Sequence, residues 1–123
     1  MTKIRGIEGI FIRSSEPDKL EKWYKEIFGF EFDDYSASII PSTQEDVEEG
    51  SYSVFGFFPE DTDYFEPSEK DVMINFRVDN ITDFIEELKD KGIEVEGPKK
   101  FEQGTFAWIM DPEGRKIEIW EMP

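Results

Sequence analysis

The chain has 123 residues, a formal net charge of −16 and neither cysteine nor histidine. These omissions exclude disulfides, thiolate metal sites and nucleophiles activated by histidine, so any metal ion would need oxygen ligands, which favours Mg, Ca or Mn. The charge disfavours nucleic-acid partners, because phosphates are bound by clusters of Lys and Arg. The absence of cysteine leads us to expect a cytoplasmic protein. With no apolar stretch of membrane-spanning length and no signal-like segment at the N-terminus, we expect no contact with membranes.

The first half of the chain is expected to form strands around one amphipathic helix. Pro17 in the first turn, Ser15 or Glu16 near the N-cap, and Gly29 just past the end delimit this helix. Its apolar side chains recur at helical spacing: Leu20, Trp23, Tyr24, Ile27 and Phe28. Apolar and β-branched patterns predict strands at 4–13, 30–35 and 52–58. The polar, acidic segment 41–50 is expected to be a loop that includes the end of another strand.

The acidic, proline-containing segment 59–70 predicts a linker, and beyond it the same order of elements returns. An amphipathic helix is expected over 81–91, with Asn80 as its N-cap and Gly92 closing it. Strands are expected at 72–78, 94–101, 105–110 and 116–121, with a turn over 111–114 between the last two.

The chain therefore reads as βαβββ twice, which predicts an α+β fold with an internal duplication. We expect one domain, composed of module one (1–58), the linker (59–70) and module two (71–123). Each module alone would leave one sheet face uncovered, so pairing the modules is expected to curl the sheets around a shared cavity. The spacing leaves open how the modules pair.

Three stretches of the sequence, 11–30, 75–92 and 111–120, resemble the glyoxalase/bleomycin-resistance/dioxygenase (vicinal oxygen chelate) superfamily. The last of them contains Asp111-Pro-Glu-Gly-Arg-Lys-Ile-Glu-Ile-Trp120 and is the most specific. The resemblance implies two tandem βαβββ modules that form a curved mixed sheet around a cavity. It also implies a homodimer, by analogy alone.

Members of this superfamily hold a metal ion with up to four inward-facing ligands, and the resemblance places these positions at Gly9, near Phe55, at Met73 and at Glu118. Only Glu118 is a suitable ligand, so we expect neither a metal ion nor another cofactor. A shift of one residue would pair Glu8 with Glu118. Glu8 alternates with Gly9, however, and is expected to point towards the helix side.

The same alignment, with strict alternation along the strands, predicts the lining of an aromatic cavity suited to a small molecule. Ile7, Gly9 and Lys116 are expected to face inward on the same grounds. The residues expected to bind a ligand are Phe11, Arg13, Phe55, Phe57, Met73, Asn75, Arg77, Trp108 and Trp120.

Arg13 and Arg77 occupy equivalent places in the two modules, which suggests a pair of cations that would hold an anionic group. The alternative is that both pair with acidic neighbours such as Glu16 or Asp79. Glu118 is likewise open to two interpretations: an acid or base of raised proton affinity, or a carboxylate held by an arginine.

The leading functional hypothesis is a metal-free protein that binds a small organic ligand, as the bleomycin-resistance branch binds a cationic drug. The alternative is a lyase or isomerase with a degenerate carboxylate site that uses Glu118 as its catalytic residue. A third hypothesis is an interaction protein whose acidic surface binds a basic partner and whose cavity is filled by its own side chains.

Overall fold

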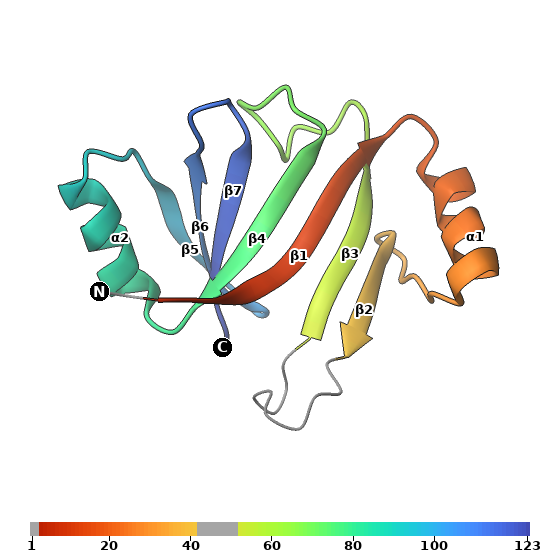
Figure 1. Ribbon diagram of the computed structural model, residues 1–123, viewed down its shortest axis with the longest axis horizontal. Coiled ribbons are helices and arrows are strands. Elements are labelled where there is room, and N and C mark those ends of the chain that lie inside the picture. Colours follow the sequence, from red (N-terminus) through yellow and green to blue (C-terminus); the bar gives the residue numbers. More distant parts are fainter. Residues whose placement is uncertain (1–2, 42–51) are drawn as a thin grey trace.

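The computed structural model describes residues 3–41 and 52–123, which form one curved sheet with two helices (Figure 1). The seven strands lie in the order β2-β3-β1-β4-β7-β6-β5. The elements in chain order are β1 (Ile4–Ser14), α1 (Pro17–Phe28), β2 (Ala37–Pro41), β3 (Tyr52–Pro59), β4 (Val72–Val78), α2 (Ile81–Asp90), β5 (Glu96–Phe101), β6 (Gly104–Met110) and β7 (Lys116–Glu121).

The two halves of the chain join through their first strands. β1 and β4 pair antiparallel, with Phe11 opposite Met73 and Ile10 opposite Ile74. Each first strand also pairs in parallel with a later strand of its own half, β1 with β3 and β4 with β7. The repeated element order therefore becomes two similar units side by side in one mixed sheet, and the pairing occurs within the chain.

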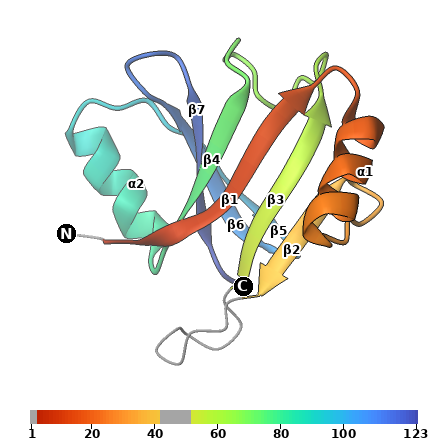
Figure 2. The ribbon, with the colours of Figure 1, turned by 45° about the vertical axis from the view of Figure 1, so that its right-hand side comes forward.

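The sheet has a convex outer face, which carries the helices, and a concave inner face (Figure 2). On the outer face, α2 buries an apolar cluster against β4, β6 and β7; it consists of Val78, Ile81, Ile85, Ala107 and Ile119. On the inner face a second cluster joins Met73 and Trp108 to Phe65 from the segment 59–70. Because side chains alternate along a strand, β4 and β6 contribute to both clusters, and burying apolar surface on both faces stabilises the sheet.

Most expected elements are present within a few residues of their predicted bounds. Helix α1 begins with Pro17 and ends at Gly29, whose φ of 73° is the left-handed conformation that favours glycine. Helix α2 is capped by Asn80, whose side chain accepts a hydrogen bond from the backbone N–H of Asp83 at 3.0 Å.

The prediction of a strand over 30–35 is wrong. This segment is a loop with a turn at its end, in which a carboxylate oxygen of Asp33 accepts hydrogen bonds from the backbone N–H groups of Tyr35 (2.9 Å) and Ala37 (3.0 Å). Such local bonds compete with strand pairing, and β2 begins only after the turn. Most of the expected loop at 41–50 lies outside the described residues.

The segment 59–70, expected as a linker, folds over one end of the inner face instead of hanging free. Phe65 is fully buried, and the hydroxyl of Ser68 donates to the carbonyl of Gly114 at 2.5 Å. This segment therefore contributes side chains to the inner face. Among the described residues, no helix is both long and apolar enough to cross a membrane.

Candidate functional site

Glu118 lies at the centre of the inner face and is only 3% exposed. One carboxylate oxygen accepts a hydrogen bond from the side-chain amide of Asn75 at 2.8 Å. The other accepts from the indole N–H of Trp108 at 2.8 Å and from the hydroxyl of Tyr64 at 2.5 Å. Sheet pairing dictates two of these contacts, because Glu118 is in register with Asn75 on β4 and with Trp108 on β6. The buried charge is thus compensated by three neutral donors.

Tyr64 reaches this carboxylate from the segment that folds over the inner face. Its ring stacks on Phe58, with the centroids 5.3 Å apart. Burial and, secondarily, the charge of Glu118 raise the pKa of the Tyr64 phenol well above its ordinary value. Although 36% of the residue surface remains exposed, the hydroxyl stays protonated and acts as a donor to the carboxylate.

Beside Glu118, the inner face borders a partly open cavity of about 140 Å³. Its lining combines aromatic rings with a few polar groups: Glu8, Phe11, Val54, Asn75, Gln103, Phe106, Glu118 and Trp120. Asn75 is 5% exposed, and its side-chain oxygen accepts no hydrogen bond from the described residues. Because a carboxylate only accepts, the amide must turn its NH₂ group to Glu118, which directs the oxygen away from it. A buried acceptor without a partner costs about 1–3 kcal/mol, which a donor from a bound molecule would recover.

Glu8 also faces this cavity, and the expectation that it points towards the helices is wrong. The pairing of β1 with β4 shifts between Ile7, which lies opposite Phe76, and Gly9, which lies opposite Asn75. This bulge adds one residue to β1 and so reverses the alternation before it. Ile7 therefore lies on the outer face, also contrary to expectation. A carboxylate oxygen of Glu8 accepts from Nε of Arg77 at 3.2 Å, and both side chains are nearly buried.

Arg13 does not pair with Arg77 at the cavity. Its guanidinium group donates to the carbonyl oxygens of Ser68 (2.9 Å) and Lys70 (3.0 Å) and lies over the ring of Phe65. Arg13 donates to these backbone carbonyls and not to Glu16, and Arg77 pairs with an acidic neighbour other than Asp79, namely Glu8. Arg13 instead holds the segment 59–70 against the sheet, and Arg77 pairs with Glu8.

The expectation that Phe55 and Phe57 line the inner cavity is wrong. Both rings contact Tyr24 of α1, with centroid distances of 5.1 and 5.4 Å, and therefore lie on the outer face. The inner positions of β3 are the alternating ones, Val54 and Phe58. Of the other residues expected to bind a ligand, Phe11, Asn75 and Trp120 line the cavity, whereas Met73 and Trp108 pack in the apolar cluster beside it.

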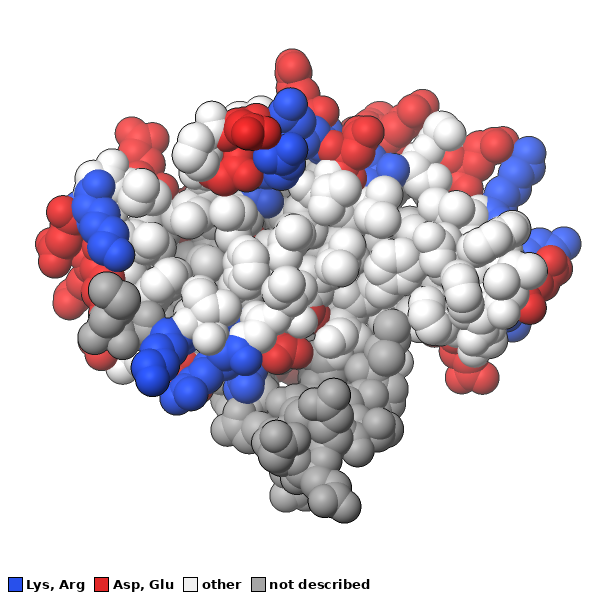
Figure 3. All heavy atoms as spheres, viewed as in Figure 1, with Lys and Arg blue, Asp and Glu red and all other residues white. Residues whose placement is uncertain are grey.

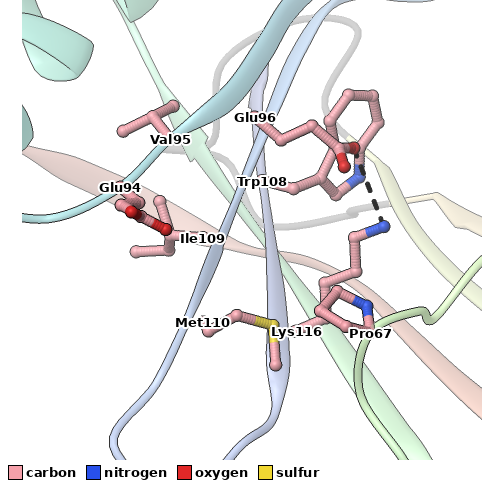
Figure 4. A pocket seen from close by; sticks show the side chains of 8 residues that line it. All are labelled: Pro67, Glu94, Val95, Glu96, Trp108, Ile109, Met110 and Lys116. Carbon is pink, nitrogen blue, oxygen red and sulfur yellow. Dashed lines mark ion pairs between the residues drawn. The ribbon is translucent and has the colours of Figure 1, made fainter.

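A second recess of about 250 Å³ is bordered by Trp108 and Lys116 (Figure 4). Lys116 points into it, donates to the carbonyl of Tyr64 at 2.9 Å, and lies 3.8 Å from the carboxylate of Glu96. The ammonium group also lies over the rings of Tyr64 and Trp108. Lys116 thus supports two of the residues that hold Glu118, but it does not itself face the inner cavity.

Comparison with protein-family models matches residues 6–119 to the Glyoxalase/Bleomycin resistance protein/Dioxygenase superfamily. The chain belongs to this superfamily. The match includes the strands and segments that hold Glu118, Asn75, Trp108 and Tyr64. No curated protein sequence matches the chain.

Solved structures of the superfamily fold are similar to the chain along nearly all of its length. A variant of Streptomyces coelicolor methylmalonyl-CoA epimerase in complex with 2-nitronate-propionyl-CoA has a TM-score of 0.68 at 17% identity, covering 98% of this chain and 96% of that one. Mycobacterium tuberculosis methylmalonyl-CoA epimerase has a TM-score of 0.63 at 13% identity, covering 98% and 89%. A structure titled as an NAD-dependent benzaldehyde dehydrogenase from Legionella pneumophila has a TM-score of 0.61 at 16% identity, covering 94% and 98%. At these identities, the similarity shows the fold alone.

The residues at the superfamily's metal positions do not fit a divalent cation. Gly9 has no side chain, and Met73 is a fully buried thioether. The position expected near Phe55 falls on the inward-facing Val54, whose side chain has no ligand atom. Both oxygens of Glu118 already accept hydrogen bonds. The described residues hold no group of three or more Asp or Glu that could bind a metal ion. Three neutral donors already compensate the charge of Glu118.

Sequence reasoning missed several residues of the site: Glu8, Val54, Tyr64, Gln103 and Phe106. For Tyr64 a signal was present, because Tyr64-Phe65 is an aromatic pair within an otherwise acidic segment. Phe106 shares the alternation of Trp108 and could have been included with it. Nothing in the sequence marks the bulge that turns Glu8 inward.

Proposed function

We propose that this protein binds a small organic ligand without a metal ion, in the inner cavity beside Glu118, and that the ligand donates a hydrogen bond to Asn75. The observation that carries the proposal is Asn75, which lines the cavity and whose buried side-chain oxygen has no hydrogen-bond partner among the described residues. Buried polar atoms are normally paired, so an unpaired one in a residue that lines a cavity supports a bound molecule as its missing partner.

The size of the cavity favours a ligand group of one ring. Its volume of about 140 Å³ is close to that of an engineered protein cavity of about 150 Å³ that binds benzene. Phe11, Phe106 and Trp120 supply aromatic surface around it. A flat aromatic group would therefore be well packed there.

The charges around the cavity favour a cation. Two carboxylates, Glu8 and Glu118, line it, and one guanidinium group, that of Arg77, pairs with Glu8. The surrounding ring faces attract cations, and the net charge of −16 would attract them at longer range. We therefore infer that the ligand carries an ammonium or amidinium group on or near its ring. This choice agrees with the cationic drug of the bleomycin-resistance branch.

Thermal unfolding with benzylammonium, benzoate and divalent metals tests this proposal. Benzylammonium at 100 times its Kd should stabilise the protein by about 2.7 kcal/mol and raise Tm by several degrees. Benzoate has the same ring and the opposite charge, and it should leave Tm unchanged. A several-degree rise with micromolar Mn, Ni or Zn, or an equal rise with benzoate, would show that the proposal is wrong.

The presence of two carboxylates at one cavity also supports a second candidate, lyase or isomerase chemistry. Glu118 would serve as the acid or base, with Glu8 across the same cavity. Against this, three donors already engage Glu118, and Arg77 engages Glu8. Turnover of a 2-oxoaldehyde–thiol adduct that is abolished in Glu118→Gln but retained in the folded Glu113→Gln control would favour the enzyme. Lack of turnover with and without metals would count against it.

The third hypothesis, an acidic protein that binds a basic partner, required a cavity filled by the chain's own side chains. Tyr64 and Phe65 fill one end of the inner face, but about 140 Å³ remains beside them. This remaining volume weakens the hypothesis.

We propose a homodimer by analogy with the superfamily. Charged groups lie mostly around the rim of the face in Figure 3, and the area over β1 and β4 is largely uncharged. Sedimentation equilibrium tests this; a monomer at micromolar concentration would contradict it.

A further inference from the structure

The second recess, of about 250 Å³, lies at the edge of the sheet where β5 begins. β5 starts at Glu96, opposite Trp108, whereas β6 continues to Met110. Residues 94 and 95 precede the strand and border the recess together with the end of β6. No described residue borders both this recess and the inner cavity, so a molecule bound here would contact a different set of side chains.

Lys116 supplies a nearly buried cation to this recess (Figure 4). The residue is 7% exposed, and its ammonium group has three N–H donors. One of them donates to the carbonyl of Tyr64 at 2.9 Å, and this is its only hydrogen bond to the described residues. Oε2 of Glu96, at 3.8 Å, lies beyond hydrogen-bond distance. Two N–H donors of a nearly buried cation therefore remain available to a molecule that accepts hydrogen bonds.

Glu96 places a negative charge beside this cation, and the two form the ion pair marked in Figure 4. An α-amino acid zwitterion carries the matching arrangement, because its carboxylate and its ammonium group are attached to one carbon atom. Its carboxylate would accept hydrogen bonds from Lys116, and its ammonium group would donate to Glu96. Because the zwitterion is neutral overall, the net charge of −16 would not repel it as it would repel a simple carboxylate.

The rest of the recess offers an apolar wall, which consists of Val95, Ile109 and Met110. Figure 4 shows Val95 and Ile109 across the recess from the ammonium group of Lys116. The volume of about 250 Å³ exceeds that of an engineered protein cavity of about 150 Å³ that binds benzene. A branched or aromatic side chain would therefore have room against this wall, and burying its apolar surface would favour binding.

From these charges and this wall, we propose that the second recess binds an apolar α-amino acid as its zwitterion. The carboxylate of the amino acid lies at Lys116, its ammonium group at Glu96 and its side chain against the apolar wall. This is a binding site in addition to the inner cavity, and it does not depend on the ligand proposed there. The ion pair selects a molecule that carries both charges, and the wall selects its side chain.

Calorimetric titration at neutral pH with L-leucine, isocaproate and isopentylammonium tests this inference. The three molecules share one branched alkyl group, but isocaproate lacks the ammonium group of leucine and isopentylammonium lacks its carboxylate. Leucine should bind at least about tenfold more tightly than either, because each of the other two loses charge-assisted hydrogen bonds.

Two matched variants of β5 and its turn test the role of the ion pair. The side chain of Glu96 is 53% exposed, so Glu96→Gln should leave the fold intact and weaken leucine binding about tenfold without weakening isocaproate. Glu102→Gln makes the same change of charge just beyond the other end of β5, at an exposed residue that does not border the recess. It should leave the affinity for leucine unchanged.

The possible results decide the inference either way. It is overturned if neither L-leucine nor L-phenylalanine binds, if a molecule with a single charge binds as tightly as leucine, or if Glu96→Gln and Glu102→Gln have equal effects. A loss of leucine binding in folded Asn75→Leu would locate leucine in the inner cavity and would also overturn it. A preference for leucine that depends on Glu96, and on neither Glu102 nor Asn75, supports the amino-acid site.

Discussion

The phenolic hydroxyl of Tyr64 donates to the carboxylate of Glu118 at 2.5 Å, although the two residues are 54 positions apart in the sequence. This contact joins the segment between the two modules to the last strand of the sheet. It also supplies one of the three donors that stabilise a buried carboxylate without a metal ion. The stability of the protein should therefore depend on Tyr64.

Replacing Tyr64 with Phe keeps the stack on Phe58 but removes a donor from a carboxylate that is 3% exposed. We expect the free energy of unfolding to fall by about 1–3 kcal/mol, because the oxygen of Glu118 loses a hydrogen bond. Chemical denaturation measures this loss. Tyr35→Phe is the control, since Tyr35 is 88% exposed. Equal small effects of the two substitutions would contradict the role of Tyr64.

The pKa of Tyr64 also predicts how stability changes in alkali. Burial and the charge of Glu118 raise this pKa above the ordinary value of 10.0, so the native state retains a proton that the unfolded chain releases. The free energy of unfolding should therefore decrease as the pH rises through the unfolded value, and this contribution is fully present only below it. Denaturation from about pH 9 to about pH 11 should show a shallower decrease for Tyr64→Phe than for the wild type. Identical slopes would argue against the raised pKa.

The two arginine–carboxylate pairs of β1 provide a matched comparison. Arg77 and Glu8 have side chains that are 8% and 11% exposed, whereas those of Arg5 and Asp79 are 48% and 51% exposed. Arg77→Met would leave a nearly buried carboxylate without its cation, and we expect a loss of about 3–5 kcal/mol. Arg5→Met should cost about 0–1 kcal/mol, because an exposed pair contributes little. Losses of similar size in denaturant titrations would show that the bulge does not bury Glu8.

The fold could be predicted because its determinants are local. Gly29 and Asn80 mark helix ends by their own conformations and side chains, and alternation over 72–78 matches β4 (Val72–Val78). The segment 30–35 was misjudged because the hydrogen bonds of Asp33 to the following backbone compete with pairing. Periodicity cannot detect that competition.

The candidate site was predicted less well because it depends on register between distant strands. Glu118 and Asn75 were placed correctly on the inner face, because their strands alternate without interruption. Glu8 was misplaced by the bulge, which only the pairing with β4 reveals. Phe55 was misplaced by one position, because its register with β1 follows a segment of unpredicted length. The contact of Tyr64 with Glu118 could not be predicted, because it depends on how the segment 59–70 folds over the inner face.

The affinity of benzylammonium for the wild type and for Asn75→Leu, measured by calorimetric titration, tests the central claim most directly. Asn80→Ser serves as the control, because it keeps a cap oxygen at α2, away from the cavity. We predict that the wild type and Asn80→Ser bind equally and that folded Asn75→Leu binds about tenfold to a hundredfold more weakly, since a hydrogen bond from a charged donor is lost. Equal affinity of Asn75→Leu and the wild type would contradict the proposed site, as would the absence of binding to all three proteins.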